Sequence, residues 1–171
     1  MRRSLACSPH KQRLKALSEI SLKYSFQLTQ TSGARKSFAV SKELKSTIKA
    51  AGKDVAESEI DGLKSFELSI VTMTDEELRE LNIQSLDHDY YTDILTFEID
   101  RTETHLLAEL YFSVDRAQEN AKKHKQSTED ELILLAIHGG LHLAGHDDHE
   151  PNAKRLMQRT QRSYLEKHRL G

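Results

Sequence analysis

The segment from residue 127 to residue 150 constrains the fold of this chain more than any other. Ser127 stands where a helix N-cap is expected, Asp130 follows three residues later, and Gly145 comes two residues after Leu143. A serine cap with an acidic residue in the first turn begins helices, and a glycine past the last turn ends them. We therefore predict a long helix through Leu143, after which Gly145 lets the chain fold back.

This predicted helix carries a pair of histidines at a metal-binding spacing. His138 and His142 are four residues apart, so they share one helix face, with β-carbons about 5–6 Å apart. Two imidazoles at this spacing can reach one ion at about 2.0–2.1 Å each. Residues 146–149 (HDDH) follow the glycine and offer a third donor. Three protein ligands would leave an open fourth position, which is the catalytic pattern for zinc, and zinc lowers the pKa of a bound water to about 7.

The residues around His138 limit which metal chemistry fits. Gly139 follows it, so the helix lacks the glutamate of an H-E-x-x-H protease motif. Gly139 and Gly140 each cost a helix about 1 kcal/mol relative to alanine, which indicates tight helix–sheet packing, close approach of another backbone, or a passing substrate. Cys7 is the only cysteine; it excludes a cysteine-rich structural zinc site and an internal disulfide, and it favours a reducing cytoplasm.

Hydrophobic periodicity predicts one α+β domain with a small mixed sheet of about four strands packed with helices. The metal site would lie on a helix of the C-terminal half and the loop after it. We assign residues 24–171 to this domain and residues 1–23 to a basic N-terminal extension. Strands are expected at residues 24–29, 66–73, 93–99 and 106–113, and helices at 41–52, 74–82, 115–125, 127–143 and from 152 onward.

Charge is unevenly distributed along the 171 residues. The formal net charge is −2, yet residues 1–23 and 151–171 each carry +5 and the middle carries −12. Basic ends can bind phosphate backbones, although solvated helix faces have the same composition. The longest apolar run, 132–137, is far shorter than the ~20 residues of a membrane span. We therefore expect no membrane association.

Four segments of the sequence resemble segments of a known protein family. "HGGLHLAGHDD" (138–148) resembles the H-G-x-L-H-L-x-G-x-D-H motif of the YbeY family, metal-dependent, single-strand-specific endoribonucleases of ribosomal RNA maturation. "TDILTF" (92–97), "AELYFS" (108–113) and the following "SVDRAQENA" (113–121) are similar to other segments of that family, in the same order. The resemblance covers roughly residues 66–157.

The resemblance also identifies candidate site residues and three departures. The family's last histidine is replaced here by Asp148, with His149 one residue later, so we expect His138, His142 and Asp148 to bind the metal, with His149 as the alternative third ligand. Leu86 stands where the family usually has an arginine. The family's acidic strand residue is Glu109 here, preceded by Ala108 where the family has a glycine. Asp93 and Glu109 could orient a ligand histidine or accept a proton, or they could be an ordinary turn residue and an ordinary surface residue.

The function implied by the resemblance is a zinc-dependent hydrolase with one Zn²⁺. It would be a cytoplasmic single-strand-specific endoribonuclease in 16S ribosomal RNA 3′-end maturation and ribosome biogenesis, with ribosomal RNA and the small ribosomal subunit as partners and no role on DNA. The basic ends would then supply the phosphate contacts that Leu86 cannot make. Two alternatives stay open. One is a metallohydrolase of another substrate class, such as a peptidase, and the other is a non-catalytic ribosome-assembly factor with a structural metal.

Overall fold

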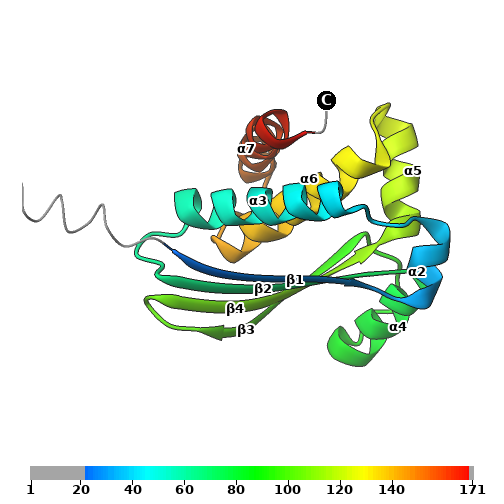
Figure 1. The fold of residues 1–171 in the computed structure, drawn as a ribbon, viewed down its shortest axis with the longest axis horizontal. Coiled ribbons are helices and arrows are strands. Elements are labelled where there is room, and N and C mark those ends of the chain that lie inside the picture. The colour runs from blue at the N-terminus through cyan, green and yellow to red at the C-terminus, as the bar shows by residue number, and fades with distance from the viewer. Residues whose placement is uncertain (1–21, 170–171) are drawn as a thin grey trace, which may run out of the picture.

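The computed structural model describes residues 22–169, and Figure 1 shows their arrangement. The predicted α+β class and four-stranded mixed sheet are both confirmed. Most of the expected N-terminal extension lies outside the described residues, but Leu22 is buried in the core and the first strand begins at Lys23. The elements are β1 (Lys23–Gln30), α2 (Ser32–Ser37), α3 (Lys42–Glu59), β2 (Ser65–Met73), α4 (Asp75–Leu86), β3 (Ile94–Arg101), β4 (His105–Ser113), α5 (Val114–His124), α6 (Thr128–Leu143) and α7 (Pro151–His168).

The sheet has the strand order β1-β2-β4-β3. β1 pairs with β2 and β2 with β4 in parallel, whereas β3 and β4 form an antiparallel pair with an irregularity between Glu98 and Asp100. A parallel pair needs a crossover connection, which α2 and α3 supply between β1 and β2. The β3–β4 pair needs only the short turn at 102–104.

Helices α3 and α6 pack on one face of the sheet, and α7 lies over them as a further layer (Figure 1). Helix α6 contacts β3, β4, α3, α5 and α7, so it is covered on nearly all sides. This placement explains the apolar run at 132–137, because a helix that is hydrophobic all round must be buried. All but one residue of that run are buried, and the exception, Leu134, packs against the core.

The two glycines of α6 permit close packing. A β-carbon at Gly139 would lie 2.8 Å from Leu110 Cδ2 on β4 and 3.0 Å from Ile94 Cδ1 on β3. At Gly140 it would lie 3.1 Å from Val55 Cγ1 on α3. Of the alternatives that the sequence left open, tight helix packing therefore accounts for both glycines.

Three local features differ from the predicted elements. Gly52 does not end its helix, which continues to Glu59; a β-carbon there would lie 3.0 Å from Tyr24 Oη, so glycine admits the strand's tyrosine. The short helix α2 was not among the expected elements; the side chain of Thr31 caps it by accepting from Ala34 N. Helix α4 runs four residues beyond its expected end, to Leu86.

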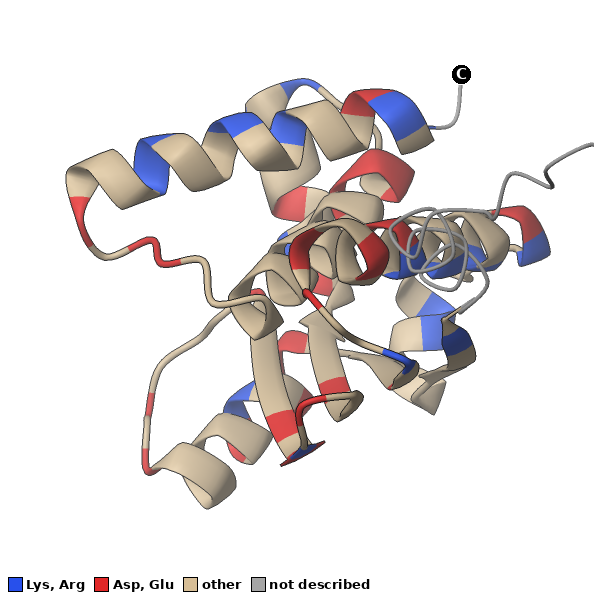
Figure 2. Cartoon of the chain, turned by 90° about the vertical axis from the view of Figure 1, so that its left-hand side faces the viewer, with Lys and Arg blue, Asp and Glu red and all other residues tan. Residues whose placement is uncertain are grey.

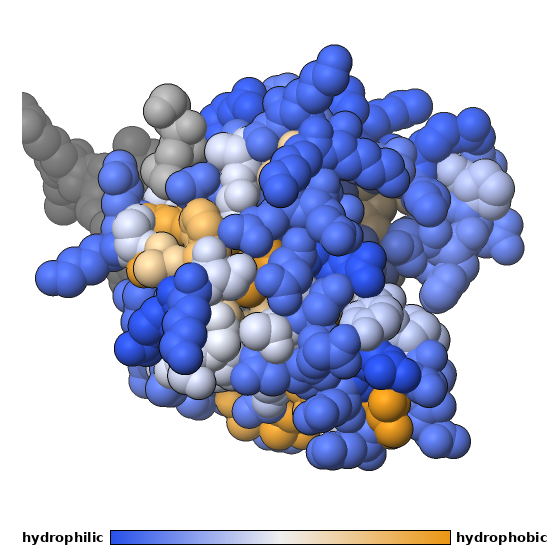
Figure 3. Space-filling model, turned by 90° about the vertical axis from the view of Figure 1, so that its right-hand side faces the viewer, coloured by the Kyte–Doolittle hydropathy of each residue, from blue (hydrophilic) through white to orange (hydrophobic). Residues whose placement is uncertain are grey.

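The opposite face of the sheet is only partly covered. Helix α4 packs there over a small second cluster built on Met73, Leu78 and Leu95. The end of the molecule formed by α2, α4 and α5 is mostly hydrophilic, with small hydrophobic areas (Figure 3). No helix within residues 22–169 is both long enough and apolar enough to cross a membrane.

Candidate metal centre

The centre is built at the C-terminal end of α6 and on the turn that follows it. As predicted, the side chain of Ser127 caps the helix, accepting from Asp130 N at 3.0 Å. Gly145 lies in the left-handed region with φ +90°, a conformation that favours glycine. Two backbone hydrogen bonds close the turn, from Gly145 N to His142 O at 2.9 Å and from His146 N to Leu141 O at 3.0 Å. The chain therefore doubles back toward the two histidines.

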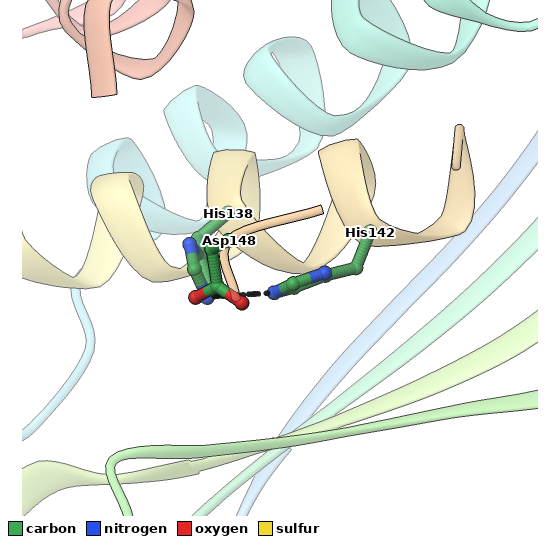
Figure 4. A group of neighbouring side chains, drawn as sticks. All are labelled: His138, His142 and Asp148. Carbon is green, nitrogen blue, oxygen red and sulfur yellow. Dashed lines mark hydrogen bonds and ion pairs between the residues drawn. The ribbon is translucent and has the colours of Figure 1, made fainter. Parts of the chain in front are cut away.

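Three side chains converge in the resulting pocket (Figure 4). The Nε2 atoms of His138 and His142 are 3.0 Å apart, and Asp148 Oδ2 lies 4.0 Å from His142 Nε2. One ligand atom from each of the three residues lies within 4.8 Å of the others. The side chains of His142 and Asp148 are 31% and 33% exposed, so the group is open to solvent on one side.

These atoms fit a metal ion well. Donors about 2.0–2.1 Å from a tetrahedral zinc stand about 3.3 Å apart, and the two distances above bracket that value. Two imidazole nitrogens and one carboxylate oxygen are also ligand types that zinc accepts. The described residues therefore contain a His/Asp cluster able to hold a metal ion, with one side open for water or substrate.

Neighbouring groups orient both imidazoles. The Nδ1–H of His142 donates to the backbone carbonyl of His146 at 3.1 Å, which leaves Nε2 as the free lone pair. The Nδ1 of His138 meets the side-chain amide of Gln161 on α7. A carboxamide offers both an acceptor and a donor, so it can match either tautomer of that ring. Sequence reasoning missed Gln161, which is 23 residues away along the chain and reaches the site only through the docking of α7.

Burial also favours the ligand form of His138. Its pKa is lowered below the usual value by burial, and further by the neighbouring His142, while Asp93 and Asp148 act in the opposite direction. A lowered pKa keeps the imidazole neutral near pH 7, and only the neutral ring can bind a metal.

The other candidates of the 146–149 segment lie elsewhere. The His149 side chain is 90% exposed, with Nε2 3.8 Å from Asp147 Oδ1, and it is not part of the group around His138. His146 donates to Glu59 Oε2 at 2.9 Å, and the same carboxylate accepts from Tyr164 at 2.7 Å. His146 thereby ties the metal-binding turn to α3 and α7. The structure brings Asp148, and not its neighbour, to the two histidines.

Asp93 and Glu109 are placed very differently. Asp93 lines a cavity of about 120 Å³ together with His138, Gln161 and the buried Glu131. Glu109 alternates with Leu110, whose methyl groups press on α6, so its side chain points to the opposite face of the sheet. There it accepts from Tyr111 Oη at 2.7 Å. The suggested role of Glu109 beside the metal is therefore wrong, because residues adjacent on a strand face opposite sides.

Glu131 is an acidic residue of the site that the sequence did not single out. It lies two turns before His138 on α6, is 5% exposed, and has its pKa raised by burial, an effect that a hydrogen bond from Gln126 opposes. The seven-residue separation from His138 was the available signal, since it places both side chains on one helix face.

Comparison with known proteins agrees with this geometry. The family model described as "Endoribonuclease YbeY" matches residues 29–169. The chain belongs to the YbeY endoribonuclease family. The resemblance seen in the sequence is thereby confirmed, and the match extends well beyond the 66–157 region on which it rested.

Individual YbeY relatives support the assignment. A protein named Endoribonuclease YbeY from Cytophaga hutchinsonii is 37% identical over 91 residues, which are 53% of this chain and 64% of that protein. Its namesake from Parabacteroides distasonis is 37% identical over 111 residues, or 64% of this chain and 77% of that protein. A solution structure from Thermotoga maritima matches with TM-score 0.54 and 26% identity, covering 84% of this chain and 87% of the other.

Proposed function

We propose that this YbeY-family protein is a single-strand-specific, metal-dependent endoribonuclease, with residues 24–171 as its catalytic domain and His138, His142 and Asp148 as its metal ligands. The observation that carries the proposal is the convergence of these three ligand atoms in a pocket open to solvent. The family name supports RNA as the substrate. Two nitrogen donors with one carboxylate are a ligand set that catalytic zinc sites use, and we propose a single zinc ion here.

Each group at the site has a role in phosphodiester hydrolysis. An ion bound there would supply a Lewis acid that lowers the pKa of water and favours the negative charge developing on the phosphate. Gln161 and the carbonyl of His146 hold the two histidine rings in orientation. We assign Asp93, which shares a cavity with His138, as the carboxylate that accepts a proton from water, and Asn120 donates to Asp93 at 3.3 Å.

Ribosomal RNA is the substrate we assign, with the small ribosomal subunit as partner and 16S RNA 3′-end maturation as the step. The motif resemblance supports this assignment. A peptidase is disfavoured because Gly139 stands where a metalloprotease helix carries its general base. A non-catalytic assembly factor with a structural metal is disfavoured because the three-ligand group is open on one side, whereas structural zinc sites are closed.

The decisive experiment offers zinc-loaded protein two substrates side by side, a single-stranded RNA and an unfolded protein. We expect metal-dependent cleavage of the RNA alone, and its loss in His142→Ala. Cleavage of the unfolded protein would support a peptidase. If His142→Ala lost its metal yet still complemented a ribosome-maturation defect, the assembly-factor alternative would be correct.

A further inference from the structure

A groove continues from the metal centre along one side of α7. Near the metal, a pocket of about 100 Å³ is lined by His138, Asp148, Lys154, Gln158 and Gln161, among others. A larger pocket of about 330 Å³ shares two of these residues, Gln158 and Gln161, and so continues from the first. Its volume falls within the range of small-ligand pockets, about 300–1,000 Å³. The two pockets adjoin each other at Gln158 and Gln161, and together we call them the α7 groove.

The wall that α7 contributes to this groove is basic. Lys154, Gln158 and Arg162 are spaced four apart, so they form one row along the helix, and Arg155 and Arg159 lie in the adjoining row. Figure 2 shows Lys and Arg at intervals along α7, while the loop before it carries acidic residues. Among residues 22–169, Lys154 and Arg162 form no salt bridge. Their charges are therefore available to an external anion.

The opposite wall is neutral and rich in hydrogen-bonding groups. His124 and Gln126 at the end of α5 face Arg162 across the larger pocket, and no residue lining that pocket is acidic. Asp93 and Asp148 lie at the end where the metal would bind, whereas the buried Glu131 lines the Asp93 cavity and accepts a hydrogen bond from Gln126 of the larger pocket. The exposed charges along the α7 side of the larger pocket are therefore basic.

We infer that the α7 groove holds the single-stranded RNA segment next to the bond that is cut, with Lys154 and Arg162, about two helical turns apart, binding phosphates of that segment. This inference rests on the proposed function. Arginine binds phosphate through two parallel N–H donors, and lysine acts as a point charge. The amide of Gln158, which lines both pockets, can both donate to and accept from base edges and 2′-hydroxyls, which are free for such contacts in single-stranded RNA. The substrate path therefore runs along α7, which belongs to the basic C-terminal segment 151–171.

The test compares two double variants of equal charge. Lys154→Ala/Arg162→Ala removes the groove charges, and Arg35→Ala/Lys42→Ala removes one arginine and one lysine that are exposed on α2 and α3. Binding of a labelled unstructured RNA of about 12 nucleotides is measured by anisotropy in EDTA at two salt concentrations. Cleavage of the same RNA by zinc-loaded protein gives kcat and KM. Melting temperature and zinc content report on the integrity of each variant.

We expect the groove variant to show a raised KM and a nearly unchanged kcat, with wild-type zinc content. Single-stranded nucleic acids release about 0.7 counterions per phosphate contact, so losing two contacts should lower the salt slope by about 1.4. When salt is raised from about 50 to about 200 mM, the ratio of wild-type affinity to variant affinity should therefore fall about sevenfold. The control variant should match wild type.

A groove variant with the KM and salt slope of the control would overturn the inference. The proposed function fails separately: if wild type binds the RNA through the groove but zinc-loaded protein does not cut it, the groove stands and the nuclease assignment falls. Should wild type cut the RNA while the groove variant behaves like the control, the nuclease assignment stands and the groove is wrong.

Discussion

Replacing Asp148 by alanine should abolish high-affinity zinc binding, whereas replacing His149 by alanine should not. Asp148 Oδ2 is 4.0 Å from His142 Nε2, so a shift of under about 1 Å brings it to tetrahedral spacing. The His149 side chain is 90% exposed and lies outside the group around His138. The two adjacent residues therefore form a matched pair, one a proposed ligand and the other its neighbour on the same turn.

The size of the effect follows from binding linkage. Loss of a residue that only supports a metal ligand weakens affinity about 10–100-fold, so loss of a direct ligand should reach at least the upper end of that range. At free zinc about 100 times the wild-type Kd, binding stabilises the folded protein by about 2.7 kcal/mol. For a protein of this size that is about 5–10 °C in melting temperature. A variant binding about 100-fold more weakly gains only about 0.4 kcal/mol, or about 1 °C.

The assay measures melting temperature with and without zinc for wild type, Asp148→Ala and His149→Ala, together with zinc content after dialysis. Melting in EDTA gives the intrinsic stability of each variant, which separates ligand loss from misfolding. We expect His149→Ala to keep the wild-type zinc shift and stoichiometry. A full zinc shift in Asp148→Ala with none in His149→Ala would refute the ligand assignment.

Three further predictions concern the surroundings of the centre. Gln161→Leu should weaken zinc binding about 10–100-fold by calorimetry, because the Nδ1 atom of His138 loses its partner. Gln161→Glu keeps an acceptor and should restore most of the zinc affinity. Equal loss of affinity in both variants would contradict the role of Gln161 in orienting His138. Gly145→Ala should cost about 1–2 kcal/mol at φ +90°, or about 2–8 °C in melting temperature; no β-carbon clash contributes, since nothing lies within 4 Å, and an unchanged melting temperature would show that the turn relaxes freely. In metal-free protein the melting temperature should fall as pH drops below the usual histidine pKa of 6.5. Burial lowers the pKa of His138 in the folded chain, so protons bind preferentially to the unfolded chain. A His138→Gln variant should lose part of this pH dependence, and a wild-type profile in the variant would argue against the prediction.

Much of the fold followed from local pattern. Alternation along β2 and β4 predicted those strands to within a residue, and the caps at Ser127 and Thr74 predicted where α6 and α4 begin, since period and capping act over a few residues. Gly52 shows where such reasoning fails. A glycine near a helix end is typical of a stop, but this one admits Tyr24 from a neighbouring strand, and only the packed structure contains that contact.

The candidate site divides in the same way. His138 and His142 could be paired from the sequence, because a helix fixes their relative position whatever surrounds it. The position of Glu109 relative to the metal could not be predicted. Alternation places Glu109 and Leu110 on opposite faces of the sheet, but it does not show which face packs against the helix that carries the histidines.

What the sequence by itself determined is a capped helix, a histidine pair on one of its faces, and a glycine at which the chain turns back. What the tertiary structure decided is which donor of the returning segment reaches that pair, which face of β4 lies outside the site, and that Gln161 and the basic row of α7 stand beside it. Helical spacing and capping are fixed by backbone geometry over a few residues. In contrast, the positions of α7, of the sheet and of the returning turn relative to one another depend on burying apolar surface between segments far apart in the chain.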